Sequence, residues 1–97
     1  MNMIVDGHIE TLSADGDSAE VDVIGPAYVH LSGTFDSGTA KIQFKGSDGT
    51  WRDVAGASYA AAADKVVDFP PRSQNTLRVN LNGSTSPALV VGIKGER

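Results

Sequence analysis

The chain has no cysteine among its 97 residues. That absence excludes a disulfide framework, a thiolate metal site and a thiol nucleophile. Small secreted domains commonly carry disulfides, so the sequence favours folding in a cytosol. No apolar run approaches the roughly 18 residues of a membrane span. Residues 1–6 also lack the basic flank and apolar core of a signal peptide, so we expect no membrane partner.

Recognisable catalytic and metal-binding motifs are missing as well. The two histidines, His8 and His30, have no HxH or HExxH spacing. A Ser-His-Asp triad could be assembled from the many serines, but the chain has no G-x-S-x-G elbow. Asp15-Gly16-Asp17 with Glu20 resembles part of a calcium loop but lacks the complete ligand spacing. We therefore expect no enzyme activity, no metal and no cofactor.

Apolar residues at helical spacing are nearly absent, whereas alternation of apolar and polar residues recurs. The clearest case is 39–45, where Ala40, Ile42 and Phe44 alternate with polar residues. The turn-forming residues on both sides, 36–38 and 46–49, predict hairpins around this strand. Eight segments are predicted as strands: 8–12, 20–24, 27–32, 39–45, 50–54, 65–69, 76–81 and 88–94.

Eight short strands at this spacing predict an all-β fold, namely an antiparallel β-sandwich of jelly-roll or Ig-like Greek-key topology. The sandwich would occupy 8–94, with an N-terminal arm 1–7 and a C-terminal tail 95–97. Residues 82–87 are predicted to form a hairpin between the last two strands. The alanine-rich stretch 55–64 is predicted to be a loop with at most one helical turn, crossing between the sheets.

The apolar faces of these strands predict the core. Trp51 and Val54 cannot both point inward in a regular strand, so either only one of them does or a bulge near Arg52 and Asp53 reconciles them. Trp51 and Tyr59 could alternatively form a carbohydrate-binding platform. The predicted core contains Ile9, Val21, Val23, Val29, Leu31, Ile42, Phe44, Trp51, Val54, Val67, Phe69, Leu77, Val79, Leu81, Leu89, Val91 and Ile93.

Charge is distributed unevenly along the chain. Residues 1–40 contain seven acidic side chains and no lysine or arginine, whereas 41–97 contain eight basic and five acidic side chains. The basic residues are dispersed, so the sequence does not predict nucleic-acid binding. Two interpretations stay open: an uneven soluble surface, or a subunit whose acidic end meets the basic end of a neighbour.

Candidate contact residues are chosen by expected exposure. The N-terminal arm could lie on an adjacent subunit and add a strand to its sheet edge. An acidic loop follows the first predicted strand, and two outward-facing residues lie on the strand 27–32. These partner-binding candidates are Met1, Met3, Ile4, Val5, Asp15, Asp17, Tyr28 and His30.

The segment 28–54 resembles a pattern found in small virion proteins of tailed bacteriophages. In that pattern a strand ending in SGTF is followed by a Gly-rich turn, an alternating strand and an S-x-DG-T-W-x-x-V hairpin. The corresponding residues here are 31–35, 36–38, 39–44 and 47–54. The hairpin-like segment 77–87 fits the same pattern, so the similarity covers about 27–93. The turn 36–38 is shorter than in the pattern, and the stretch 60–63 is richer in alanine.

The resemblance implies a structural role, most like that of capsid decoration (cement) proteins, which are typically β-rich, enzymatically inert and oligomeric. It implies the major capsid protein and further copies of the chain, as a trimer or dimer, as partners. It also implies a location on the outer capsid surface after synthesis in the bacterial cytoplasm. The alternatives are a tail, connector or fibre-associated virion protein, or an Ig-like or carbohydrate-binding module.

Overall fold

The computed structural model of the chain describes residues 7–46 and 48–95, and these residues form nine β-strands. None of them belongs to a helix long and apolar enough to cross a membrane. The all-β prediction is confirmed. The strands are β1 (His8–Leu12), β2 (Gly16–Asp17), β3 (Val21–Ile24), β4 (Ala27–Thr34), β5 (Thr39–Lys45), β6 (Trp51–Tyr59), β7 (Ala63–Val67), β8 (Gln74–Asn82) and β9 (Ala88–Gly95).

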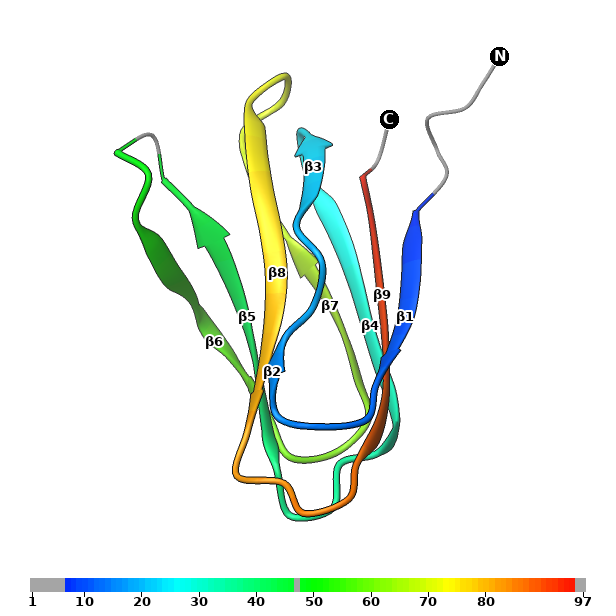
Figure 1. Ribbon diagram of the computed structural model, residues 1–97. Coiled ribbons are helices and arrows are strands. Elements are labelled where there is room, and N and C mark those ends of the chain that lie inside the picture. Colours follow the sequence, from blue (N-terminus) through cyan, green and yellow to red (C-terminus); the bar gives the residue numbers. More distant parts are fainter. Residues whose placement is uncertain (1–6, 47, 96–97) are drawn as a thin grey trace.

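The strands form two antiparallel sheets that face each other (Figure 1). Sheet A has the order β1-β9-β4-β7, and sheet B has the order β2-β8-β5-β6, with β3 also paired to β8. All connections cross from one sheet to the other except β2 to β3 and the β5–β6 hairpin. This connectivity is that of a jelly roll, one of the two topologies that the sequence predicted.

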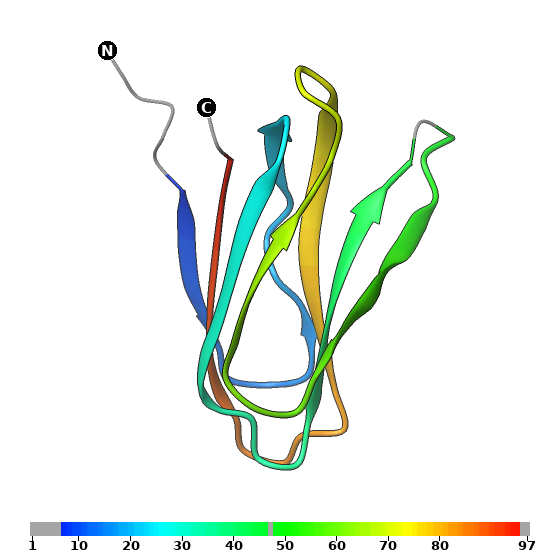
Figure 2. The same ribbon diagram turned by 180° about the vertical axis from the view of Figure 1, so that it is seen from behind.

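Two segments predicted as hairpins are instead crossings between the sheets. Residues 36–38 join β4 to β5, and 82–87 join β8 to β9, but each pair of strands lies in opposite sheets. These crossings gather at one end of the sandwich, where the sheets lie close together, and the sheets diverge toward the other end (Figures 1 and 2). Turn-forming residues indicate a chain reversal, but they do not specify whether the reversed strand pairs with its predecessor.

The alanine-rich stretch 55–64 is mostly strand, so the loop prediction is wrong over most of its length. Strand β6 continues to Tyr59 and pairs with β5, and β7 begins at Ala63. The expected crossing between the sheets does occur there. A bulge is also present, but it lies at 54–57, opposite the single β5 residue Ile42. Pairing of Ser58 and Tyr59 with β5 carries β6 to residue 59, so only 60–62 remain outside the strands of this stretch.

The core lies between the two sheets and is built mainly from β4, β5, β8 and β9. Val21, Phe44, Val54 and Phe69 pack at its margin. Phe44 and Phe69 meet edge to face, with ring centroids 5.6 Å apart. The largest fully buried side chains are Leu31, Ile42, Leu77, Leu81, Leu89, Ile93, Val29, Val79 and Val91.

Two predicted core residues lie outside the core. Ile9 is 77% exposed, because it pairs with Gly92 on the outer side of sheet A, whereas Leu12 of the same strand is buried. Trp51 pairs with Lys45 on the outer side of sheet B, and Val54 points inward instead. The predicted core also omitted five buried hydrophobic residues, Leu12, Ala27, Phe35, Ala40 and Ala57.

Candidate functional site on the outer face of sheet A

The outer face of sheet A brings together outward-pointing residues from four strands. Because alternate residues of a strand point to opposite faces, strand pairing arranges them in rows across the sheet. One row contains Ile9, Gly92, His30 and Asp64, and the next contains Lys94, Tyr28 and Val66. Ile9 and Val66 are 77% and 53% exposed, so this face presents large apolar side chains to solvent.

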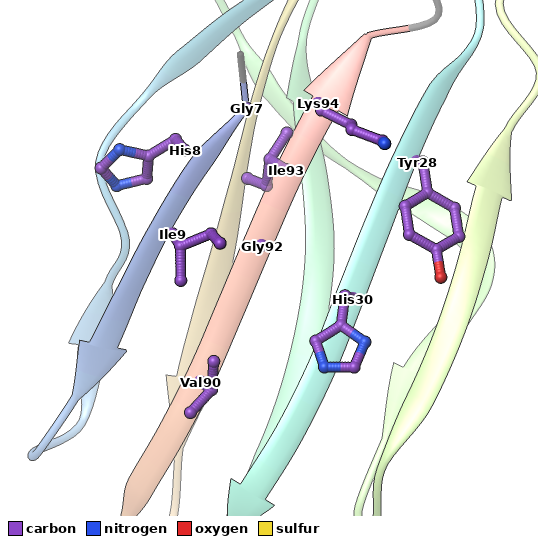
Figure 3. A pocket seen from close by; sticks show the side chains of 9 residues that line it. All are labelled: Gly7, His8, Ile9, Tyr28, His30, Val90, Gly92, Ile93 and Lys94. Atoms are coloured by element: carbon purple, nitrogen blue, oxygen red, sulfur yellow. The ribbon is translucent and has the colours of Figure 1, made fainter. Parts of the chain in front are cut away.

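A groove of about 400 Å³ crosses the middle of this face (Figure 3). It exists because Gly92 has no side chain, while Ile9 and Val90 rise beside it and His30 lies across the neighbouring strand. A Cβ added to Gly92 would lie 3.6 Å from the His30 Cβ and 3.8 Å from the Ile9 Cγ1. A side chain at position 92 would therefore occupy the floor of the groove in contact with residues on both sides.

A polar network borders the groove along β4 and β7. His30 Nδ1 lies 2.7 Å from Asp64 Oδ1, and His30 Nε2 lies 3.0 Å from Ser32 Oγ. The Tyr28 hydroxyl donates to the same Asp64 carboxylate. These bonds, first that from His30 and then that from Tyr28, hold the pKa of Asp64 below its ordinary value, so Asp64 is ionised at neutral pH.

Tyr28 connects this network to the basic edge of the groove. The Lys94 ammonium lies 6.0 Å from the centroid of the Tyr28 ring, at the outer limit of a cation–π contact. The hydrogen bond to Asp64 is the main cause that raises the pKa of the Tyr28 hydroxyl. The phenol therefore stays protonated and keeps donating to Asp64 throughout the neutral range.

The sequence-predicted contact residues fall into three groups. Tyr28 and His30 both lie on the outer face of sheet A, which agrees with the prediction that their side chains point outward. Asp15 and Asp17 lie away from this face and bond to groups within the chain. The arm residues Met1, Met3, Ile4 and Val5 lie outside the described residues.

The carboxylates of the acidic loop fasten it to neighbouring strands and turns. Asp15 accepts from the backbone N–H groups of Gly83 and Ser84, each at 3.0 Å, and from the Ser84 hydroxyl. Asp17 accepts from Asn80 Nδ2 at 2.8 Å and lies 3.3 Å from Arg78 Nη1. The loop that resembled part of a calcium site therefore uses its carboxylates to bind the crossing 82–87 and β8.

On the outer face of sheet B, polar side chains form hydrogen bonds and ion pairs with one another. Arg78 Nε donates to Gln43 Oε1 at 2.8 Å, and Gln43 Nε2 donates to Asp53 Oδ1 at 2.8 Å. Lys45 Nζ lies 3.7 Å from Glu20 Oε1. Acidic residues of the first part of the chain thus meet basic residues of the second part within one molecule, which reduces the charge left for a neighbouring subunit.

Trp51 and Tyr59, the alternative carbohydrate platform, do not share a face of the sheet. Trp51 lies on the outer side of sheet B, whereas Tyr59 pairs with Ala40 and packs against the core. The bulge at 54–57 separates the two residues. The ring of Trp51 is covered by Arg78, whose guanidinium carbon lies 4.0 Å from the ring centroid.

Sequence reasoning missed Ile9, Val66 and Gly92 as surface residues, and Ser32 and Asp64 as neighbours of His30. Alternation along 27–32 did indicate that His30 and Ser32 share a face. The place of Asp64 beside His30 depends on the pairing of β4 with β7, which local sequence does not specify. Within 7–46 and 48–95, no three or more histidine, aspartate or glutamate side chains are grouped so that they could hold a metal ion.

No protein-family model and no curated protein matches the chain. Among solved structures it is similar to PirA, at 17% identity and a TM-score of 0.55 over 91% of each chain. It is also similar to the Yersinia pseudotuberculosis-derived mitogen, at 13% identity and a TM-score of 0.58, covering 96% of this chain and 88% of that one. A chain of infectious bursal disease virus, Gx strain, aligns at 14% identity with a TM-score of only 0.32, over 31% of its length. The first two similarities establish the fold alone.

Proposed function

We propose that the chain is a structural protein of a tailed-phage virion, a capsid decoration protein that binds the major capsid protein at capsomer junctions. The observation that carries this proposal is the contrast between the two outer faces. Sheet B carries hydrogen bonds and ion pairs around Arg78 and, among the described residues, exposes one large apolar side chain, Ile24, whereas sheet A exposes Ile9 and Val66 together with an apolar groove. The resemblance of 28–54 to small phage virion proteins supports the choice of partner.

The outer face of sheet A is the surface proposed to contact the capsid. Burying an exposed isoleucine or valine fully contributes about 1.5–3 kcal/mol, and Ile9 and Val66 lie on opposite edges of this face. Tyr28, between them, offers a large ring with a polar tip, a combination enriched at protein interfaces. Such a modest contact becomes effective when each subunit of a dimer or trimer engages its own capsid protein, because the sites then act together.

Binding to phage heads tests the proposal. Heads of the phage that encodes the chain would be emptied, stripped of accessory proteins, and incubated with Ile9→Lys and, as a matched control, Ile24→Lys. Ile24 is also exposed, at 51%, but belongs to β3 of sheet B. We expect Ile9→Lys to weaken binding at least about 10-fold, as a loss of about 1.4 kcal/mol requires, and Ile24→Lys to leave it nearly unchanged.

Two results would overturn the proposal: equal effects of the two substitutions, or no binding of the unmodified chain to the heads. Circular dichroism and melting temperature would confirm that both variants are folded. The number of bound copies separates the capsid from other virion locations. Decoration requires hundreds of copies per head, whereas a copy number matching a single ring would place the chain at a connector or tail.

A further inference from the structure

Ser32, His30 and Asp64 form a hydrogen-bonded chain in the order nucleophile, base and orienting carboxylate. The distances are 3.0 Å between Ser32 Oγ and His30 Nε2, and 2.7 Å between His30 Nδ1 and Asp64 Oδ1. Both values lie in the range of the hydrogen bonds that connect a catalytic triad. The arrangement follows from the sheet, because residues 30 and 32 share one face of β4 and His30 pairs with Asp64 of β7.

The hydrogen bonds of His30 determine which of its ring nitrogens carries the proton. An ionised carboxylate only accepts hydrogen bonds, so His30 Nδ1 carries the ring proton and donates to Asp64. In the neutral imidazole, Nε2 is then the acceptor and receives the Ser32 hydroxyl. The Tyr28 hydroxyl also donates to Asp64 and helps to hold that carboxylate in place. The tautomer is therefore the one in which a histidine can remove the serine proton.

We propose that Ser32 is a nucleophile activated by His30, which accepts the acyl group of esters whose apolar acyl chain lies in the groove over Gly92. Ser32 Oγ bonds to the ester carbonyl carbon, and the bond from that carbon to the alkoxide oxygen breaks. The hydroxyl proton of Ser32 passes to His30 Nε2 and then to the departing alkoxide. The products are an acylated Ser32 and a free alcohol, and no further reactant is required.

The groove provides the acyl-chain site because it begins beside the reacting atoms. Ser32 pairs with Val90, and Val90 lines the groove together with Gly92 and Ile9. Ser32 lies within a strand, not at the strand–helix turn whose backbone N–H groups supply the oxyanion hole of many serine hydrolases. Without that stabilisation, acylation requires an ester with a good leaving group, and attack by water on the acylated serine, whose leaving group is the poorer serine alkoxide, is slow. The expected product is therefore a lasting adduct.

This chemistry goes beyond the proposed structural role and is tested on the free chain, since a docked partner would cover the same face. The chain would be incubated with p-nitrophenyl acetate or p-nitrophenyl hexanoate, and adducts would be located by peptide mass spectrometry. Ser58, exposed on β6 of sheet B, is an internal control in every sample. We expect Ser32 to be acylated at least about 100-fold faster than Ser58, as general-base assistance allows.

Three variants sharpen the test. His30→Asn and Asp64→Asn should each slow acylation of Ser32 by about 100-fold or more. Gly92→Val should fill the groove and remove the preference for hexanoate over acetate, while acetate still reacts. If Ser32 and Ser58 of the unmodified chain are acylated at comparable rates, the proposal is overturned and no variant is needed to show it. An unchanged rate in folded His30→Asn also overturns the proposal. Neither result bears on binding to phage heads.

Discussion

The guanidinium carbon of Arg78 lies 4.0 Å from the centroid of the Trp51 ring on the outer face of sheet B. The Arg78 side chain is only 19% exposed, and it also bonds to Gln43 and lies beside Asp17. Arg78 therefore connects its own strand, β8, to β2, β5 and β6. This one residue ties together all the strands of the main path of sheet B.

Arg78→Lys should lower the free energy of unfolding by about 1–2 kcal/mol, because lysine cannot stack flat on the indole while donating to Gln43 and Asp17. Urea unfolding measures this loss, and the emission of Trp51, the only tryptophan, should shift to the red as its ring becomes more hydrated. Arg72→Lys, at an exposed loop position, is the control and should change stability by less than about 0.5 kcal/mol. Equal effects of the two substitutions would show that the network adds no stability.

Two isoleucines from different sheets, one buried and one exposed, test the register of the strands. Ile42 is fully buried in β5, so Ile42→Ala should cost about 2–5 kcal/mol through lost burial and the cavity left behind. Ile9→Ala should cost less than about 0.5 kcal/mol because Ile9 is exposed. Chemical denaturation of both variants measures the difference. A large loss for Ile9→Ala would mean that β1 turns its other side to the core.

Gly33 is required at the end of β4 for two separate reasons. Its φ is +89°, which favours glycine, and an added Cβ would come far inside van der Waals contact with the Ala88 carbonyl oxygen. Gly49 also has a positive φ, of +80°, but no atom lies within 4 Å of its added Cβ. Gly49→Ala should therefore cost about 1–2 kcal/mol from backbone strain alone.

Gly33→Ala should exceed that cost by at least about 2 kcal/mol, because the backbone of β9 must also move. The two melting curves, recorded side by side, isolate the steric contribution. Similar losses for both variants would show that β4 and β9 separate easily at this point.

Stability should fall in acid partly through Asp15. Its hydrogen bonds, first those from the hydroxyl and backbone of Ser84, lower the pKa of Asp15 below its ordinary value of 3.8. A carboxylate whose pKa is lower in the folded state contributes stability above the unfolded pKa and loses it as pH falls through the folded pKa. Asp15→Asn should therefore reduce the melting temperature most near pH 7, and this reduction should shrink as the pH falls below 3.8. If the difference in melting temperature between Asp15→Asn and the unmodified chain stays constant with pH, the proposed contribution of Asp15 ionisation to stability is excluded.

Local pattern predicted much of the secondary structure. The strands 8–12 and 39–45 were predicted at the bounds that β1 and β5 have, because period-two alternation is a property of the local chain. The prediction failed over most of 55–64, because pairing of Ser58 and Tyr59 with β5 continues β6 past the bulge and β7 begins at Ala63. It also failed for Ile9, which was predicted to lie in the core. Apolar residues also occur on protein surfaces, so an isoleucine in a strand does not by itself show which face of the strand is buried.

The amino-acid sequence by itself determined that the chain is a single all-β sandwich and that Tyr28 and His30 point outward, since these features follow from alternation within strands. Only the tertiary structure decided that two expected hairpins cross between sheets, that Asp64 reaches His30, and that Gly92 opens a groove beside Ile9. Each of these depends on which strands become neighbours. Strand pairing is set by the free energy of the whole core, and residues adjacent in sequence do not encode it alone.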